Sequence, residues 1–587
     1  MDGELMSNSV VRDPATFEVF RNAISGLADQ MAITVLRTAH SQIVAESMDF
    51  SAALCDAKGQ LIAQANTIPV HLGSTPEAMK EIFGNFGSNI APGDIYILND
   101  PDQGGMHLPD LFVIEPIHEG QNLLGFAVAI ANHADVGGWA AGSMAVQSTS
   151  IFAEGIQIPP SRLVDAGVMN ETLLKVIMRN CREPELFLGD LESQLSACHA
   201  GANGIRELAH RYGQNEYAHL CADLLDYSET LLLSALAQVP AGEYFFKDAM
   251  DNDGLGHGPI PLVVKVTISA TNVHFDFTGS SAQVASALNA TSSFTKSGAY
   301  AALQGAVGRD IPPNAGFYRP ITFTIPSGTI LNPIRPAARG ARGLTGLRVI
   351  DLVLGALSPA FPDTVPAGGD GSPNTVAIGI TEESGKSIVI WDILCGAWGA
   401  RPNRDGLDAA SSLGANLSNT PVEEMERAGL IRIDGYGYIP DTGGPGKFRG
   451  GLATFRDMTL LYGQATLRGR SDRRDFPPYG LQGGKNGTPS ANILNLGSPD
   501  EELLPTKPSI DVIAGTRHRH ITASGGGYGN ALERDPELVL LDVLEEKVTV
   551  AGAMLDYGVV IENNEIDHNA TKVLRSESKK TENEKGR

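Results

Sequence analysis

The sequence has no long apolar run, no paired cysteines and no excess of basic residues. No segment approaches the roughly 18 consecutive apolar residues that a membrane-spanning helix needs, and no secretory leader opens the chain. We therefore expect a cytoplasmic protein that does not enter a membrane. The net charge of −24 argues against nucleic acid or an anionic membrane as a partner, because both require a basic binding face.

The five cysteines are scattered, and none belongs to a Cys-x-x-Cys pair. This spacing argues against a zinc ribbon and against a disulfide framework. Cys198 and His199 are adjacent within a segment that we expect to be helical. We interpret them as a buried thiol beside a surface histidine and not as a nucleophilic dyad.

Nucleotide-binding motifs are also missing. Residues 383–387, Glu-Ser-Gly-Lys-Ser, resemble the end of a phosphate-binding loop, but the first glycine is misplaced and residues 388–390 have the pattern of a strand. We interpret this segment as a β-turn. The glycine-rich loop at 525–529 lacks the preceding strand and following helix of a dinucleotide site. The chain by itself therefore has no convincing nucleotide site.

A chain of 587 residues with 42% hydrophobic and 19% charged residues is an ordinary globular protein that is larger than one typical domain. Hydrophobic periodicity predicts an α+β protein: a large mixed multi-layer fold with a central helical block and a β-rich C-terminal domain. The expected regions are an N-terminal extension (1–12), an α+β metal-site region (13–165), a helical region (166–240), an α+β middle region (241–430), a β-rich region (431–566) and a disordered tail (567–587).

The most informative stretch is residues 93–142. A strand at 95–98 leads into a polar loop with His107 and Asp110, and a later apolar run ends in a turn with His133 and Asp135. His133 and Asp135 are two residues apart, so in an extended geometry both would face the same way. Imidazole and carboxylate groups at strand ends suit zinc, manganese or iron(II). The alternative is that these are ordinary turn residues, and spacing alone does not decide between the two.

The same stretch carries a resemblance. Its motifs are NDP-x-x-GG-x-HLPD (99–110), HADVGG (133–138) and EG-x-x-IPP (154–160). Further motifs lie elsewhere in the chain: MDFSAALCDAKGQLIAQA at 48–65, IPVHLGS at 68–74, GGPGKFRGG at 443–451, YGLQGGKNG at 479–487 and SGGGYGN at 524–530. Together these motifs resemble the hydantoinase B/oxoprolinase family. The resemblance spans roughly residues 12–562. It implies the metal-bearing half of an ATP-dependent hydrolase of cyclic amides, or of a ketone carboxylase.

In such systems ATP is held by a separate hydantoinase A-like subunit, which phosphorylates the substrate oxygen, and the B-like subunit completes the reaction at its metal. The resemblance therefore implies an α2β2-type heteromer that opens a hydantoin, 5-oxoproline or another lactam. A phosphorylated ring has an activated carbonyl carbon, and a metal-bound water with a pKa near 7 can attack it. Two alternatives stay open: a subunit of an ATP-dependent ketone carboxylase, and a non-catalytic scaffold for the ATP-binding subunit.

The expected metal ligands are His107, Asp110 and His133, with Asp49 as the fourth; the metal is zinc, manganese or iron. Asp135 is either a ligand that displaces Asp49 or a base that orients the bound water. His71 is expected to contact substrate, or else to be a buried structural histidine.

An arginine cluster follows in the β-rich region, comprising Arg468, Arg470, Arg473 and Arg474. Guanidinium groups suit phosphate or carboxylate, so the cluster could hold a phosphorylated intermediate. The preferred interpretation is a surface or interface cluster that pairs with Asp472 and Asp475. The family resemblance also suggests that the β-rich domain returns to the active-site cleft.

Overall fold

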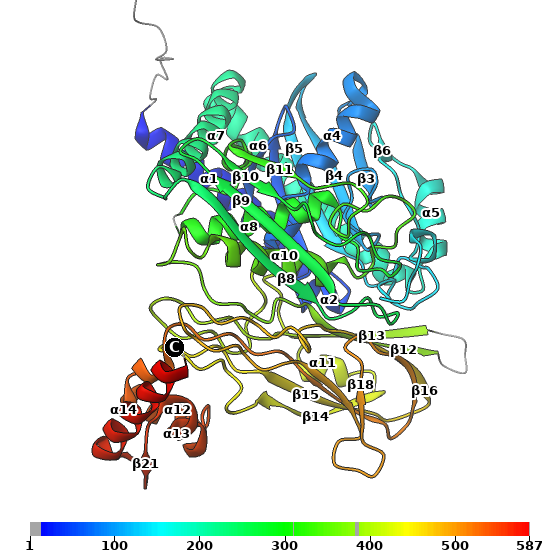
Figure 1. Ribbon diagram of the computed structural model, residues 1–587. Coiled ribbons are helices and arrows are strands. Elements are labelled where there is room, and N and C mark those ends of the chain that lie inside the picture. The colour runs from blue at the N-terminus through cyan, green and yellow to red at the C-terminus, as the bar shows by residue number, and fades with distance from the viewer. Residues whose placement is uncertain (1–12, 309, 382–386, 586–587) are drawn as a thin grey trace, which may run out of the picture.

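The computed structural model describes residues 13–308, 310–381 and 387–585, which form two stacked bodies and a small helical module (Figure 1). The upper body contains the blue to green part of the chain, the lower body is built from yellow and orange strands, and the red module lies beside the lower body. The α+β class predicted from the sequence is confirmed. Within these residues, no helix combines the length and the apolar character that crossing a bilayer demands.

A seven-stranded antiparallel sheet is the centre of the upper body, with the strand order β2-β1-β5-β4-β3-β6-β7. Its strands are β1 (Phe50–Asp56), β2 (Leu61–Gln64), β3 (Ile95–Leu98), β4 (Asp110–Glu119), β5 (Asn122–Asn132), β6 (Ser161–Asp165) and β7 (Val168–Met169). Asp110 at the start of β4 lies opposite Asn132 at the end of β5, and Phe50 at the start of β1 lies opposite Ala131. The register therefore gathers Asp49, Asp110 and Asn132 at one edge of the sheet.

Helices cover one face of this sheet. They are α1 (Pro14–Thr38), α5 (Glu171–Asn180), α6 (Pro184–Tyr212) and α7 (Gln214–Leu236). The Asp13-Pro14 pair is a typical helix start, and the Asp13 carboxylate accepts hydrogen bonds from the first-turn amides of Ala15 and Thr16. The predicted helical block is confirmed. It packs directly on the sheet. The absence of a side chain at Gly204 of α6 lets α1 approach closely, because a Cβ at this position would lie only 2.2 Å from a Leu27 methyl group.

The opposite face of the sheet packs against α4 (Thr75–Phe86), α8 (Ser292–Val307) and α10 (Arg342–Leu357). Beyond these helices lies a second sheet of four strands, with the order β11-β10-β9-β8: β8 (Gly242–Met250), β9 (Ile260–Ile268), β10 (Val273–Asp276) and β11 (Ile321–Thr324). One core, which includes Phe112, Phe126, Phe275 and Phe294, fills the space between the sheets. The regions expected at 13–165, 166–240 and much of 241–430 thus belong to one layered body. Three single-turn helices complete it: α2 (Gln42–Ala45), α3 (Pro69–Leu72) and α9 (Ala315–Tyr318).

One helix is shorter than the sequence pattern indicated. The apolar pattern of residues 284–309 favours a helix over this whole range, but α8 begins only at Ser292. The Thr291 hydroxyl accepts a hydrogen bond from the Phe294 amide and so caps the helix at that point. Before it, the Asn289 side chain donates to three backbone carbonyls, which satisfies an irregular segment in place of helical hydrogen bonds.

The lower body is a sandwich of two sheets around its own core. One sheet has the order β13-β12-β16-β19, and the other has the order β14-β15-β20-β17-β18. The strands are β12 (Asn374–Thr381), β13 (Ser387–Leu394), β14 (Ile431–Tyr438), β15 (Thr454–Leu460), β16 (Gln464–Arg470), β17 (Ala491–Leu494), β18 (Glu502–Leu504), β19 (Ser509–Ile513) and β20 (Arg517–Ile521), with helix α11 (Val422–Glu426) at its side. The strand expected at 388–390 is confirmed as part of β13, and the β-turn expected at 383–386 lies outside the described residues.

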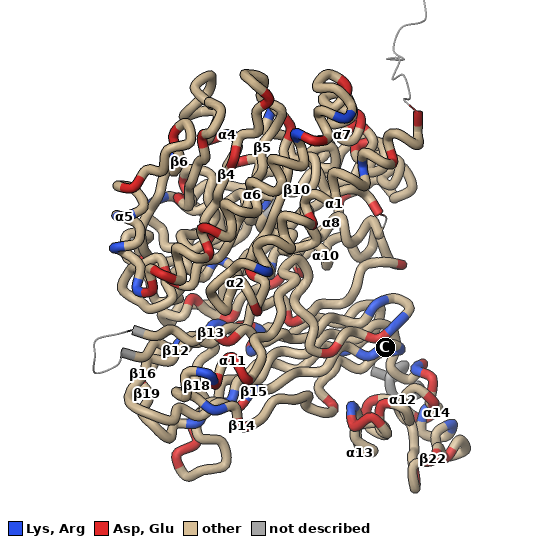
Figure 2. The backbone as a smooth tube through the Cα atoms, turned by 180° about the vertical axis from the view of Figure 1, so that it is seen from behind, with Lys and Arg blue, Asp and Glu red and all other residues tan. Residues whose placement is uncertain are grey.

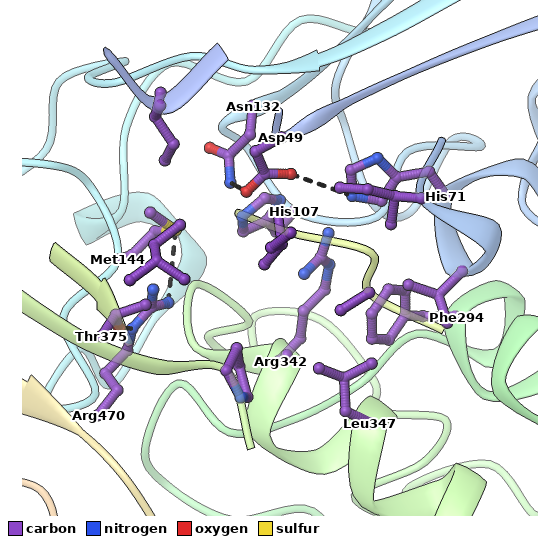
Figure 3. A pocket seen from close by; sticks show the side chains of 18 of the residues that line it. Asp49, His71, His107, Asn132, Met144, Phe294, Arg342, Leu347, Thr375 and Arg470 are labelled. Atoms are coloured by element: carbon purple, nitrogen blue, oxygen red, sulfur yellow. Dashed lines mark hydrogen bonds and ion pairs between the residues drawn. The ribbon is translucent and has the colours of Figure 1, made fainter. Parts of the chain in front are cut away.

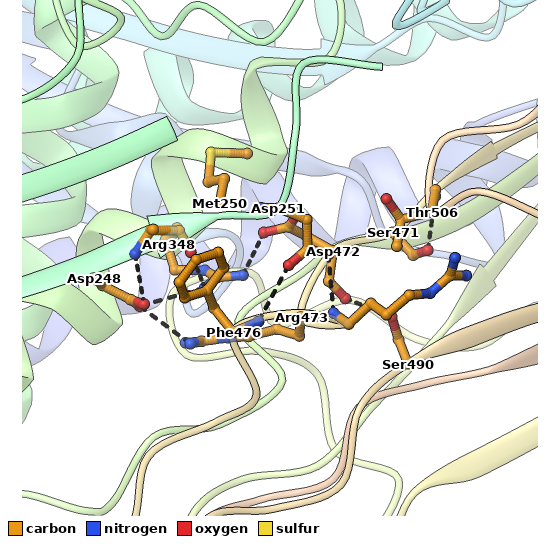
Figure 4. A network of polar contacts seen from close by, with 12 residues as sticks. Asp248, Met250, Asp251, Arg348, Ser471, Asp472, Arg473, Phe476, Ser490 and Thr506 are labelled. Atoms are coloured by element: carbon orange, nitrogen blue, oxygen red, sulfur yellow. Dashed lines mark hydrogen bonds and ion pairs between the residues drawn. The ribbon is translucent and has the colours of Figure 1, made fainter. Parts of the chain in front are cut away.

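A buried ion-pair network joins the two bodies (Figure 4). Arg348 of α10 donates to Asp472 at 2.5 Å, and Lys507 donates to the same carboxylate at 2.9 Å. Arg473 reaches back into the upper body and pairs with Asp248 and Asp351. The surface interpretation of the arginine cluster is therefore wrong for Arg473, because its side chain is completely buried between the bodies.

The C-terminal part of the chain differs from its prediction. The region 431–566 is β-rich only up to β20, and then continues as helices α12 (Pro536–Leu544) and α13 (Val550–Tyr557). The tail expected to be disordered from 567 forms helix α14 (His568–Lys585), next to the short hairpin of β21 (Ile561–Glu562) and β22 (Glu565–Ile566). Acidic and basic residues crowd this module (Figure 2), and such a composition suggests disorder. The tail is ordered because Arg575 donates to the backbone carbonyls of Tyr557 and Arg534.

Candidate active site

A small pocket of about 60 Å³ lies at the edge where β1, β4 and β5 end. Residues of the upper body line one side of it, among them Asp49, His71 and His107. The lower body closes the other side with Thr375, Trp391 and Arg470, as Figure 3 shows in part. The expectation that the β-rich domain returns to the cleft is therefore met by the structure.

Asp49 is held by the end of β5. Its backbone carbonyl accepts a hydrogen bond from the Asn132 amide at 3.0 Å, and its carboxylate accepts one from the Asn132 side chain at 2.9 Å. Burial, together with the nearby negative charge of Asp110, raises the pKa of Asp49 to about 7. A carboxyl group with this pKa can accept and release a proton near neutral pH.

His71 stands on the single turn of α3 and faces the two carboxylates. Ser51 donates its hydroxyl hydrogen to the Ile68 carbonyl, so Nδ1 of His71, 3.3 Å from the Ser51 oxygen, is the donor of that contact. Burial lowers the pKa of His71 to about 4, so the ring is neutral. Its Nε2 lone pair then faces Asp49 at 3.7 Å and Asp110 at 3.8 Å. Three acceptors thus converge without a donor between them.

His107 and Asp110 belong to one rigid loop, and the structure brings them together. Nδ1 of His107 lies 2.8 Å from Oδ2 of Asp110, and the same carboxylate receives the guanidinium of Arg342. Burial would raise the pKa of Asp110, but the positive charge of Arg342 and the hydrogen bond with His107 hold it below the ordinary value. Burial also lowers the pKa of His107 to about 4. Asp110 is therefore an ionised carboxylate that is completely removed from solvent.

His133 lies behind the pocket, against helix α6. The Gln194 side chain donates to the carbonyls of Leu111 and Ala129, so its oxygen accepts a hydrogen bond from Nε2 of His133 at 2.9 Å. This arrangement fixes the tautomer and leaves a free lone pair on Nδ1, which is buried and has no partner. Burial lowers the pKa of His133, so the ring is neutral.

Asp135 does not reach the pocket. Its carboxylate accepts hydrogen bonds from the amides of Gly137, Gly142 and Arg182, and from the Arg182 guanidinium at 2.8 Å. These four donors occupy both oxygens and hold the turn that follows β5. The expected role of Asp135 as a base or metal ligand does not fit these contacts.

Two arginines line the site: Arg342, which the sequence analysis did not single out, and Arg470, which it named only as a member of the arginine cluster. Arg342 begins α10, in a run of the chain rich in arginine, and Arg470 ends β16. Arg470 donates to the Thr375 hydroxyl at 2.6 Å and lies over the ring of Trp391. In the described residues it has no carboxylate at ion-pair distance, and burial beside Arg342 lowers its pKa to about 10. Arg470 can therefore receive an anionic group of a substrate.

The side chains of the pocket are of the types that bind a metal ion, but they are not arranged around a common metal position. Over 13–308, 310–381 and 387–585, no three His, Cys, Asp or Glu side chains already stand in a metal-binding arrangement, and the guanidinium of Arg342 supplies the positive charge beside Asp110. Even so, Oδ1 of Asp110 and Nδ1 of His133 are buried acceptors without partners. Unpaired buried acceptors next to a second imidazole and a second carboxylate have the chemistry of a divalent-metal site once Arg342 moves aside.

Residues 13–531 match the family of hydantoinase B and oxoprolinase. The chain belongs to this family. The resemblance inferred from its motifs is thereby confirmed, and the HLPD and HADVGG motifs that carried it lie at or directly behind the pocket.

Relatives within the family are components of enzymes and longer enzymes. The chain is 31% identical to the B component of a putative D-/L-hydantoinase from a Pseudomonas species, over 96% of this chain and 98% of that protein. It is 30% identical to the β subunit of the caprolactamase of Pseudomonas jessenii, over 96% and 99%. It is also 30% identical to the 5-oxoprolinase of Dictyostelium discoideum, of which it covers 40% while 88% of this chain is matched.

Two solved structures share the fold. The crystal structure of the ATP-dependent caprolactamase from Pseudomonas jessenii superposes with a TM-score of 0.90 at 30% identity, covering 96% of this chain and 100% of that chain. A nucleotide-free structure of an acetone carboxylase also superposes with a TM-score of 0.90, covering 97% of this chain and 83% of that chain, but at 19% identity. The second likeness shows a common fold only.

The cysteines take no part in the site. All five are buried and free of disulfides. Cys198 contacts strand carbonyls, and His199 pairs with Glu115 at 2.6 Å and points partly to solvent. The interpretation of Cys198-His199 as a buried thiol beside a surface histidine agrees with these contacts.

Proposed function

We propose that this chain is the metal-dependent hydrolytic subunit of an ATP-dependent enzyme that opens a cyclic amide such as a hydantoin, 5-oxoproline or another lactam. The observation that carries the proposal is the buried cluster of Asp49, His71, His107 and Asp110, closed by two arginines, in a family member whose relatives are named hydantoinase and caprolactamase subunits. A hydrolase of this kind needs both a metal-binding donor set and a cationic group for an activated substrate.

The ligands proposed for the metal are His107, Asp110 and His133, with Asp49 as the fourth. His71 adjoins the same carboxylates and contacts the substrate or the metal. A zinc, manganese or iron(II) ion at this place would act as a Lewis acid and lower the pKa of a water molecule. Gln194 prepares His133 for this role because it leaves the Nδ1 lone pair free.

The chain's own side chains supply the remaining functions. Arg470 binds the phosphoryl group of a substrate that has been activated by a partner, because its guanidinium is buried and has no carboxylate of its own. Asp49 has a pKa of about 7 in the metal-free chain, so its carboxyl group must release a proton to serve as the fourth ligand. Trp391 and the other walls of the pocket exclude bulk water from the reacting bond.

The partner in this proposal is a hydantoinase A-like subunit that binds ATP, joined in an α2β2-type assembly. The described residues contain no P-loop, and two relatives are named as single subunits, one of a hydantoinase and one of a caprolactamase. A ketone carboxylase is the main alternative, and it rests on a structure that shares the fold at 19% identity. Substrate turnover separates the two, because a carboxylase incorporates bicarbonate and a lactamase consumes water.

The proposal is tested with the complex purified from cells that co-express the ATP-binding subunit. We expect about one equivalent of metal per chain and ATP-dependent ring opening of at least one lactam. His107→Ala and Asp110→Asn should lose both, whereas His199→Ala, on the partly exposed face of α6, should keep both. Arg470→Gln should keep the metal and lower kcat/KM by about 10- to 100-fold, the loss of one charged hydrogen bond. Full metal content in the His107 and Asp110 variants would refute the ligand assignment, and a metal-free active complex would refute the mechanism.

A further inference from the structure

The catalytic pocket is too small for the substrate that it is proposed to act on. Its volume of about 60 Å³ holds only a few water molecules, whereas small-molecule sites usually measure about 300–1,000 Å³. A second cavity of about 570 Å³ falls within that range. It lies between α8, α10 and the loops around Thr67 and Trp398.

The two cavities have a common wall that is one residue layer thick. Three segments contribute neighbouring residues to both sides of this wall. In 67–71, Thr67 and Pro69 line the large cavity, whereas Ile68, Val70 and His71 line the pocket. The other two are 413–417, where Leu413 and Gly414 line the cavity and Ala415 and Leu417 line the pocket, and α10, where Ile350 and Leu354 line the cavity and Leu347 lines the pocket. Segment 67–71, which ends in the first three residues of α3, faces loop 413–417 across this wall.

The hydrogen bonds between loop 413–417 and the segment around 67–71 are few and long. The Val70 amide donates to the Gly414 carbonyl at 3.3 Å, and the Asn416 side chain donates to the carbonyls of Asn66 and Thr67 at 3.5 and 3.3 Å. Loop 413–417 has no regular secondary structure. Contacts of this kind can part at little cost compared with those of a helix or sheet.

We propose that the large cavity is the vestibule that receives the substrate ring, and that the ring enters the catalytic pocket when loop 413–417 moves away from segment 67–71. This inference rests on the proposed function, since it concerns the ring on which that function acts. It assigns recognition of ring size and substituents to the vestibule and leaves the reacting bond to the pocket.

The lining of the vestibule defines the class of ligand. Apolar groups of Ile350, Leu354 and Trp398 lie among amide and hydroxyl side chains. Among the residues that the structure describes, the charged ones of the lining are Asp29 and Arg401, one of each sign. The Asp29 carboxylate already accepts from the Asn66 amide at 3.1 Å, and Arg401 donates to the Asp405 carbonyl at 2.8 Å. The vestibule thus suits a compact ring with an apolar body and one polar edge, as in a five- to seven-membered lactam.

Gly305 offers a way to fill the vestibule without disturbing the fold. It lines the cavity from helix α8, is exposed, and a Cβ built on it would meet no atom within 4 Å. A side chain is also favourable at a helical glycine. Gly84 of α4 is a matched control, because it is equally helical, exposed and free of neighbours but lines neither cavity.

The first experiment measures turnover of lactams of five to seven ring atoms by the complete two-subunit complex. Gly305→Phe should lower kcat/KM at least tenfold, and more for larger rings, while its metal content stays that of the parent. Gly84→Phe should match the parent for every ring. Equal kcat/KM in the two variants would overturn the vestibule and leave the proposed function intact.

A second experiment measures binding without ATP. The chain has three tryptophans; Trp398 lines the vestibule, Trp391 lines the pocket and Trp139 lines neither. In the 5-fluorotryptophan-labelled chain, a free lactam should shift the ¹⁹F signal of Trp398, as identified with Trp398→Phe, and this shift should vanish in Gly305→Phe but not in Gly84→Phe. If turnover shows the Gly305 defect but the free ring causes no shift, the vestibule receives the phosphorylated ring. If the complex opens no lactam, the proposed function fails, and the vestibule then stands or falls on the Trp398 shift alone.

Discussion

The guanidinium of Arg342 lies directly against the carboxylate of Asp110, and both side chains are buried beside His107. In the metal-free chain Arg342 thus compensates a charge that would otherwise be unpaired in a medium of low dielectric constant. A divalent metal bound to Asp110 would take over this compensation. Arg342 and the metal are therefore expected to act as alternative counter-ions of one carboxylate.

This relation predicts the stability of Arg342→Met. In the presence of a chelator, the free energy of unfolding should fall by about 3–5 kcal/mol, the usual cost of breaking a buried ion pair. With saturating metal the loss should be much smaller, because the metal stabilises the ionised carboxylate. Urea unfolding with and without metal measures both values.

Arg335→Met, which removes a half-exposed arginine near Asp100 and Asp102, should change stability by less than about 1 kcal/mol in either condition. Equal losses for Arg342→Met in both conditions would contradict the alternation of counter-ions.

Gln194 is predicted to control metal affinity without contacting the metal. Gln194→Leu removes the acceptor that holds Nε2 of His133, so the ring can turn and its Nδ1 lone pair is no longer fixed. Loss of such an orienting partner typically lowers metal affinity about 10- to 100-fold, measured here as the Kd in a competition titration. Cys198→Ala is the control, since Cys198 lies one turn further along α6 and contacts carbonyls of the same two strands but no histidine. Similar Kd values in the two variants would show that His133 is only structural.

Local patterns in the sequence predicted the elements and the first pair of site residues well. Helix α1 and the strands β4 and β5 follow from periodicity, and His107 and Asp110 come together because they are only three positions apart in the sequence. The direction of His133 was not predictable in this way. The chain leaves β5 after Asn132, whose side chain turns to Asp49, so His133 lies behind the pocket against Gln194 and Asp135 is held in the turn that follows.

Long-range contacts account for the rest. Arg342 meets Asp110 across 232 positions of the sequence, and no periodicity encodes such a contact. The runs of arginine at 335–348 and 468–474 were a usable signal, because so many cations in a chain of net charge −24 need buried acidic partners or anionic ligands. Helix α14 was missed because its order depends on the Arg575 contacts with Tyr557 and Arg534, while its composition alone suggests disorder.

Glu154 should make the stability of the chain depend on pH. Its carboxylate accepts from the backbone amides of Arg339 and Gly340, yet burial raises its pKa to about 7 from an ordinary value of 4.5. Between these two pH values the folded chain binds a proton that the unfolded chain has released. This contribution to stability is complete below pH 4.5, declines as the pH rises, and is lost above about pH 7.

Glu154→Gln should therefore flatten the pH profile. The difference in unfolding free energy between parent and variant should change by about 3 kcal/mol from pH 4.5 to pH 7.5, in favour of the variant at high pH. Denaturant unfolding at half-unit steps of pH measures it. A difference that is independent of pH would mean that the two backbone amides keep Glu154 ionised throughout.

Asp472 should couple the unfolding of the two bodies. It accepts from Arg348 of the upper body and from Lys507 of the lower body (Figure 4), and all three side chains are fully buried. Asp472→Asn keeps the shape but leaves two buried cations without a full counter-charge. We expect a loss of about 3–5 kcal/mol that falls on the contact between the bodies and leaves their separate cores intact. Scanning calorimetry should then resolve two transitions where the parent has one.

Asp434→Asn, which weakens the partly exposed pair with Arg432 on β14, should keep a single transition within about 1 kcal/mol of the parent. A single, equally shifted transition in Asp472→Asn would show that the bodies unfold together even without this network.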